Sequence, residues 1–253
     1  MAFSSCEPSL ETPTTYVHPL PRSHSRGDAL NIPTIFAIQG GLLLVAAITM
    51  YVNWRMNRSL PETEFGALAF AWMVVAAFLL SGFWGSPEAS TVLGRLLIIV
   101  GNVLYTLSFV LFKAGARCVT DRSPLHLSQI LWIIATLGVA QAIGDFGTDH
   151  GAILRPAIST TGLTLISAST VWVVFSTTDR MTAPRGLFAV FSIMAAVALA
   201  LRSVLLIMSD FGWTFSELLQ DALLFYALTL MISGYTVECI LLTVHALNVQ
   251  LRD

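Results

Sequence analysis

The chain has 253 residues, of which 55% are hydrophobic and only 11% are charged, and its formal net charge is −2. Soluble globular domains average about 25% charged residues, so this chain has too few charges to cover a water-facing surface. We therefore expect lipid to be its main solvent, and the composition excludes a basic surface for binding nucleic acid.

The first 32 residues form a polar segment that is rich in proline. It has no apolar stretch of the kind that a signal peptide carries. Such a segment cannot bury enough apolar surface to order itself, so we expect a disordered tail over residues 1–32.

Seven apolar runs of spanning length follow this tail. About 20 residues of α-helix cross a hydrocarbon core of about 30 Å. The runs are continuous rather than alternating, and lipid requires each segment to satisfy its own backbone groups, so helices are favoured over a barrel. The runs cover residues 33–53, 64–83, 92–113, 126–145, 153–176, 186–208 and 222–247. The sequence thus predicts an all-α polytopic membrane protein, with a seven-helix transmembrane domain over 33–247 and a short tail over 248–253.

The distribution of cations predicts the orientation of this bundle. Seven spans place the two ends of the chain on opposite sides, and cytoplasmic loops carry an excess of Lys and Arg. The side of the C-terminal tail has eight such residues: Arg55, Arg58, Lys113, Arg117, Arg122, Arg180, Arg185 and Arg252. The other side has four: Arg22, Arg26, Arg95 and Arg155. We therefore expect the N-terminus outside and the C-terminus in the cytoplasm.

Two charged residues lie within the apolar runs, Arg202 in the sixth and Glu238 in the seventh. An ionisable group inside a membrane costs about 2.5–3.5 kcal/mol on insertion scales, so it normally has a partner or a function. Their depths differ by about 15 Å at 1.5 Å per residue, and an ion pair needs about 4 Å. We expect Arg202 to reach outward to Asp210, Glu217 or Asp221, and Glu238 to lie near the cytoplasmic interface. Arg202 can be a structural anchor or part of a sensing site. Glu238 can be a protonated or interface-exposed acid, or a sensing or proton-handling one.

Asn102 in the third run and Gln141 in the fourth are uncharged polar residues within the expected spans. Hydrogen bonds between helices, worth about 0.6 kcal/mol on average, are the simplest explanation for such residues. Together with Arg202 and Glu238, they form our candidate set of sensing or helix-packing residues.

A polar outer loop offers a weaker candidate, a divalent-metal site. Asp145, Asp149 and His150 lie within six residues, and carboxylate and imidazole groups are metal ligands. A hydrated polar loop explains the same residues and is the interpretation that we favour. His126 and His245 lie at the ends of expected spans, which does not favour a haem held between them. No retinal-binding lysine, hydrolase motif or phosphate loop occurs, so we expect neither a cofactor nor an enzymatic activity.

Residues 51–122 carry a recognisable pattern, YVNWRMNRSLPETEFGALAFAWMVVAAFLLSGF followed by TVLGRLLIIVGNVLYTLSFVLFKAGARCV. A short basic loop precedes an apolar span, a brief outer turn, and a span that contains Gly101-Asn102 and ends in Gly-Ala-Arg. This stretch resembles the multi-span N-terminal sensor region of bacterial membrane diguanylate cyclases (GGDEF proteins), which also precedes some histidine kinases. Those proteins have an Asn in the third span, and Asn102 is the matching position.

The resemblance implies a sensor-like signalling module of the bacterial inner membrane, with the last span as its output element. No GGDEF or kinase sequence follows that span, so no catalytic activity is implied: either the effector is absent, or another chain supplies it. The expected partners are the lipid bilayer and either a cytoplasmic effector or a second copy. Two alternatives remain open: an accessory or scaffold subunit of a larger complex, and a small-molecule transporter or channel subunit. The small number of intramembrane charges and the lack of an inverted repeat argue against the transporter or channel.

Overall fold

The computed structural model describes residues 32–58, 60–83, 90–119, 123, 125–147, 151–176, 183–210 and 217–250. These residues form seven α-helices and no strand. The helices are α1 (Ile32–Met56), α2 (Pro61–Phe83), α3 (Val92–Val119), α4 (Leu127–Phe146), α5 (Gly151–Phe175), α6 (Ala183–Asp210) and α7 (Glu217–Gln250). The expected disordered tail lies outside the described residues, apart from its last residue.

Each helix coincides with one of the seven apolar runs, so the prediction of an all-helical chain is confirmed. Within the described residues, five helices contain segments that are long and apolar enough to cross a membrane. They are Pro61–Gly82, Val92–Cys118, Leu127–Phe146, Ile153–Phe175 and Gly186–Ser209. The last helix contributes a shorter apolar stretch, Ala222–Val237. The protein is therefore a multi-pass membrane protein by the length and composition of its helices.

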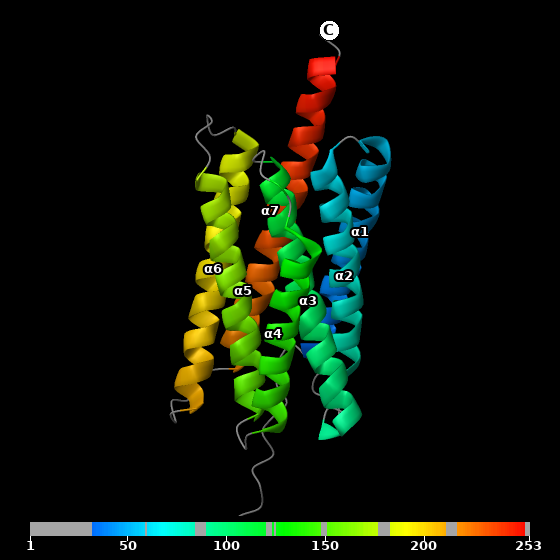
Figure 1. Cartoon of the computed structure of the whole chain (residues 1–253). Helices are drawn as coiled ribbons and strands as arrows, with labels where there is room; N and C mark the ends of the chain where they lie inside the picture. Colours follow the sequence, from blue (N-terminus) through cyan, green and yellow to red (C-terminus); the bar gives the residue numbers. More distant parts are fainter. Residues whose placement is uncertain are drawn as a thin grey trace, which may run out of the picture.

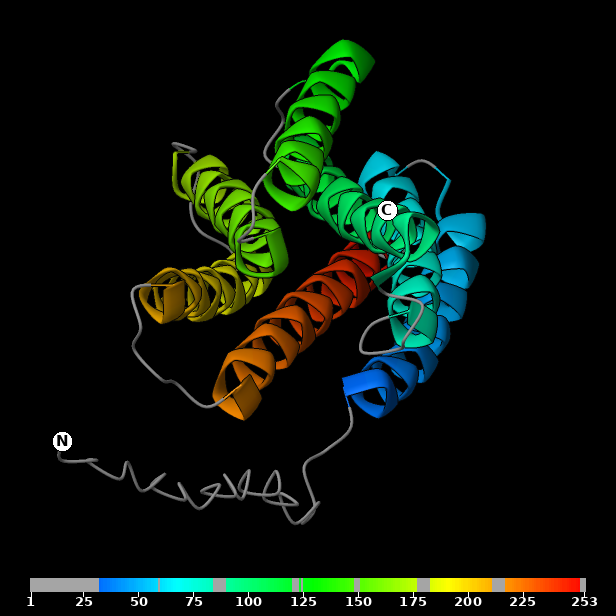
Figure 2. The ribbon, with the colours of Figure 1, turned by 90° about the horizontal axis from the view of Figure 1, so that it is seen from below.

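The helices run alternately up and down and form a ring (Figures 1 and 2). Around the ring, α1 packs on α2, α2 on α3, α3 on α5, α5 on α6, and α6 on α7, which returns to α1 and α2. The remaining helix, α4, packs against α3 and α5 outside the ring. Its buried residues are few, and two of them are the polar Gln141 and Asp145. Few buried side chains therefore hold α4 against its neighbours.

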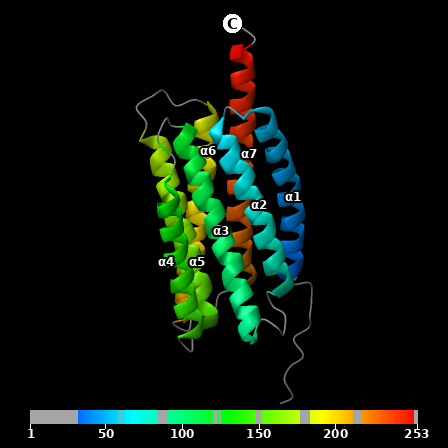
Figure 3. The ribbon, with the colours of Figure 1, turned by 45° about the vertical axis from the view of Figure 1, so that its right-hand side comes forward.

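The final helix, α7, is longer than the bundle. Its 34 residues extend about 51 Å at 1.5 Å per residue, against a hydrocarbon core of about 30 Å. Figures 1 and 3 show its C-terminal turns rising past the ends of the other helices. One continuous helix thus connects the interior of the bundle with the space beyond it.

An aromatic cluster centred on Tyr235 fixes α7 within the bundle. The ring of Tyr235 lies 4.4 Å from that of Phe112 in α3, 6.3 Å from Phe70 in α2 and 5.8 Å from Phe188 in α6, measured between centroids. All four side chains are fully buried. The Tyr235 hydroxyl donates a hydrogen bond of 3.0 Å to the backbone carbonyl of Glu62, which satisfies its polar atom.

Two glycines make room for this tyrosine. A Cβ atom at Gly66 would lie 2.5 Å from Tyr235 Cε1 and 2.7 Å from Met50 Cε, and a Cβ at Gly115 would overlap the Tyr235 hydroxyl oxygen. Real Cβ atoms do not approach other atoms so closely. The side chain of Tyr235 can therefore reach α2 and α3 only because both positions lack a Cβ.

Candidate functional site

A small polar cavity, which we call the central cavity, lies inside the ring of helices. Its volume is about 20 Å³. The polar part of its wall consists of Asn102 and Tyr105 from α3, Ser159 and Thr160 from α5, and Arg202 from α6. Leucines from α2, α5 and α7 complete the lining. A polar cavity needs about 10–15 Å³ to hold a water molecule, so this one has room for a ligand of only a few atoms.

The guanidinium of Arg202 connects three helices at this cavity. Its side chain is only 3% exposed. Nε donates a hydrogen bond of 2.9 Å to the backbone carbonyl of Gln220 in α7, and Nη1 donates one of 2.6 Å to Oγ1 of Thr160 in α5. The Thr160 hydroxyl donates in turn to the carbonyl of Pro156, at 2.6 Å. A charged group in the membrane interior is thus held by hydrogen bonds, as its cost requires.

The described partners of Arg202 differ from those expected from the sequence. The acids toward which it was expected to extend have side chains outside the described residues, so that expectation stays a prediction. The side chain of Glu238 is also outside the described residues. Its backbone lies 18 residues beyond Gln220 on the same helix, about 27 Å at 1.5 Å per residue. Arg202, which contacts Gln220, is therefore farther from the Glu238 backbone than the roughly 15 Å expected from the sequence, and both spacings exceed the ~4 Å of an ion pair.

Two polar groups in the wall of the central cavity lack partners. Asn102 and Tyr105 are both buried, and Asn102 Nδ2 and the Tyr105 hydroxyl form no hydrogen bond with the described part of the chain. The expectation that Asn102 bonds to a neighbouring helix is therefore not met at Nδ2. Leaving a buried polar group unsatisfied costs about 1–3 kcal/mol. These two groups are therefore available to a bound molecule in the cavity.

Gln141 lies apart from the central cavity. It is completely buried on α4, and neither atom of its side-chain amide has a hydrogen-bond partner among the described residues. No described residue therefore supplies the hydrogen bond between helices that was expected for Gln141. The structure thus places Asn102 and Arg202 around one cavity and leaves Gln141 outside it.

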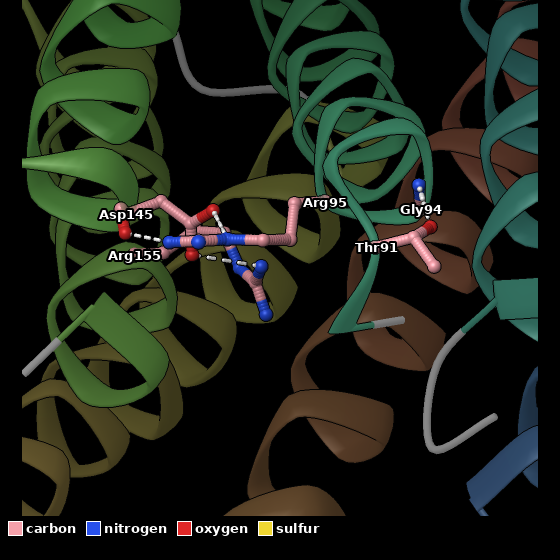
Figure 4. Close-up of polar contacts among 5 residues, drawn as sticks. All are labelled: Thr91, Gly94, Arg95, Asp145 and Arg155. Carbon is pink, nitrogen blue, oxygen red and sulfur yellow. Dashed lines mark hydrogen bonds and ion pairs between the residues drawn. The ribbon is translucent and has the colours of Figure 1, made fainter. Parts of the chain in front are cut away.

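A second polar group, which we call the outer ion cluster, joins α4 to its neighbours (Figure 4). The carboxylate of Asp145 is 2% exposed and lies between two guanidinium groups. Its Oδ2 is 2.7 Å from Arg95 Nε in α3, and its Oδ1 is 3.0 Å from Arg155 Nη1 in α5. Arg95 also donates to the backbone carbonyl of Asp145 and lies 4.3 Å from the ring centroid of Phe146. One acid therefore connects three helices.

These contacts bear on the possible metal site. Both oxygens of the Asp145 carboxylate accept hydrogen bonds from cations, and two guanidinium groups would repel a divalent ion there. Asp149 and His150 lie outside the described residues, so the metal hypothesis stays untested. Over the part of the chain that the structure describes, no three potential metal ligands come together.

Several residues of these sites did not stand out in the sequence. Tyr105 could have been found, because it lies three residues after Asn102 and therefore on the same helix face. Thr160 belongs to a run of small and hydroxyl residues that close helix packing explains on its own. Arg95 and Arg155 were assigned only to the orientation of the bundle, and nothing local to them indicates a shared acid.

The spanning helices define the class of this protein: a multi-pass α-helical membrane protein, here with buried polar groups between its helices. Comparisons of the chain with protein-family models, with curated proteins and with solved structures find no match. The function is therefore argued from the geometry of the central cavity and of α7.

Proposed function

We propose that this chain is a sensor-like signalling module of the bacterial inner membrane, with seven spans and no catalytic activity of its own. In this proposal the N-terminus lies outside and the C-terminus in the cytoplasm, where α7 acts on an effector protein. One observation carries the proposal. Arg202 binds the backbone of α7 at Gln220, and the same helix continues without interruption to Gln250, past the end of the bundle.

The mechanism that we infer is a lever. Tyr235 is anchored by ring contacts and a hydrogen bond, and it lies midway, 15 positions after Gln220 and 15 positions before Gln250. Each arm is about 22 Å long at 1.5 Å per residue. A change of hydrogen bonding in the central cavity that displaces Gln220 by about 1 Å would move the far end by a similar amount in the opposite direction. Helix shifts of about 1–2 Å are typical of switching membrane and soluble proteins.

A second candidate function is an accessory or scaffold subunit of a larger complex. It is favoured by the apolar side chains that the upper part of α7 exposes. They are Val237, Ile240, Leu241 and Val244. Contiguous exposed apolar side chains often mark an interaction surface. This function predicts a protein that stays bound to α7 through purification, whereas the signalling function requires movement of α7.

The lever can be tested with two spin labels in lipid nanodiscs. One label replaces Gln250 at the end of α7, and the other replaces Met56, an exposed residue at the end of α1. The three native cysteines, Cys6, Cys118 and Cys239, are first changed to serine. Pulsed electron resonance then gives the distance distribution between the two labels.

We expect Arg202→Gln to displace the mean distance by about 1–2 Å or to broaden its distribution, because α7 loses its charged contact at Gln220. Arg95→Gln is the matched control, since Arg95 contacts α4 and not α7. An unchanged distribution in a folded Arg202→Gln protein would rule out α7 as the output of the central cavity.

A further inference from the structure

The central cavity presents hydrogen-bond donors without described partners, beside hydroxyl and amide groups that can also accept. Asn102 Nδ2 and the Tyr105 hydroxyl are buried donors without a partner in the described chain. The guanidinium of Arg202, which only donates, lies in the same wall. The hydroxyl of Thr160 is already engaged on both sides, because it accepts from Arg202 and donates to Pro156. A molecule that presents acceptors can therefore satisfy the two donors that have no partner in the described chain.

Size restricts that molecule further. The cavity of about 20 Å³ is closed by Leu80, Leu163, Leu224 and Leu228, which present no polar atoms. A ligand must therefore be compact, with its acceptor atoms on one side and little or no apolar chain on the other. Water also fits a cavity of this size, and the titration described below distinguishes it from a carboxylate.

We propose that the central cavity binds a small monocarboxylate of the size of formate or acetate. Its two oxygens accept from Asn102 Nδ2 and the Tyr105 hydroxyl, beside the guanidinium of Arg202. A carboxylate matches a wall of donors, and hydrogen bonds to an ionised oxygen are about twice as strong as those to a neutral one. This inference deepens the proposed function, because the carboxylate would be the stimulus that changes the hydrogen bonding of Arg202.

The test is a titration of the full-length protein in nanodiscs, followed by its thermal unfolding. Sodium formate, acetate and propionate are compared at constant ionic strength, with acetamide as a neutral molecule of similar shape. We expect a saturable rise of the unfolding temperature with formate and acetate. The rise should be weaker with propionate, whose longer chain meets the leucines, and absent with acetamide.

Variants assign the effect to the cavity. Tyr105→Phe removes only the unpartnered hydroxyl, so the protein should fold normally and bind the carboxylate about tenfold more weakly. Asn102→Leu should weaken binding to a similar extent. Tyr51→Phe is the matched control, because Tyr51 is an exposed tyrosine of α1 outside the cavity, and its affinity should equal that of the parent protein.

Three results would overturn the proposal: no saturable shift with any carboxylate, an equal shift with acetamide, or an affinity that Tyr105→Phe leaves unchanged. None of them concerns the movement of α7, which Arg202→Gln tests without ligand. If the carboxylate binds and the spin-label distance does not respond to Arg202→Gln, the binding site stands and the signalling function fails. If the spin-label distance responds to Arg202→Gln but no carboxylate binds, α7 remains an output element, and its stimulus is a different one.

Discussion

The outer ion cluster makes a quantitative prediction, tested by Asp145→Asn. The substitution keeps the shape of the side chain and removes its negative charge. Arg95 and Arg155 would then face each other without the carboxylate that binds both. Since α4 buries few other side chains, we expect this helix to loosen first.

The exposed fractions of the three side chains determine how much unfolding free energy each substitution should remove. Removing one member of a buried ion pair typically costs about 3–5 kcal/mol. Asp145 is 2% exposed and Arg155 is 12% exposed, so this pair is close to that case. Arg95 is 31% exposed, and solvent screens its share of the interaction. We expect losses of about 3 kcal/mol for Asp145→Asn, about 2 kcal/mol for Arg155→Gln and below about 1 kcal/mol for Arg95→Gln.

The assay is reversible unfolding of the purified variants in nanodiscs, with hydrogen exchange to locate the opening. The double variant Asp145→Asn with Arg155→Gln should be more stable than the sum of the two losses predicts, because it removes the uncompensated buried cation. Arg55→Gln is the control, since Arg55 is an exposed cation elsewhere. Two results would contradict this assignment of the ion pairs. One is a loss of unfolding free energy in Arg95→Gln as large as that in Asp145→Asn, and the other is hydrogen exchange in α4 no faster than in α5 of the Asp145→Asn protein.

Three further predictions concern the interior. Gly115→Ala should lower the free energy of unfolding by about 1–3 kcal/mol because its Cβ overlaps the Tyr235 hydroxyl; Gly41→Ala, with nothing within 4 Å, should cost nothing. Tyr235→Phe should lower the free energy of unfolding by about 1 kcal/mol, because it loses the hydrogen bond to Glu62. Combined with Gly115→Ala it should restore stability, because it removes the hydroxyl that the new Cβ overlaps. Failure of that rescue would contradict the packing of Tyr235 against Gly115. Gln141→Leu should raise the free energy of unfolding by about 1–3 kcal/mol, because it removes an amide without partners in the described chain; a loss would show that the amide is satisfied.

The seven helices could be predicted from the sequence because each apolar run is long and continuous, and a helix satisfies its own backbone groups in lipid. The ends of the helices could not be predicted in the same way. Glu217–Gln250 begins five residues before and ends three residues after the run 222–247. Hydropathy reports the part of a helix that lipid surrounds, and it does not detect polar turns that continue the same helix into water. The projection of α7 was therefore not predicted.

The sites were predicted in part, for a similar reason. Arg202 and Asn102 stand out because charged and amide groups are rare inside apolar runs. Tyr105 does not, because a tyrosine in a membrane helix is ordinary until its hydroxyl is found without a partner. Asp145 was assigned to neighbours in its own loop, whereas its partner Arg95 lies 50 residues away. Only the packing of α4 against α3 brings the two together.

The two contacts that hold α7 have different chemistry, and this difference separates binding from transmission. Arg202 holds the helix at Gln220 through a charged hydrogen bond beside the central cavity, whereas Tyr235 holds it through packing and one neutral bond. Removing the Tyr105 hydroxyl should therefore weaken carboxylate binding while α7 keeps its resting position. Gly115→Ala should displace α7 at Tyr235 and alter the spin-label distance. Because coupling between two sites is reciprocal, a lever also requires this displacement to change the affinity for the carboxylate. An affinity that stays unchanged when α7 is displaced would mean that the cavity and the helix are not coupled, and α7 could not act as a lever.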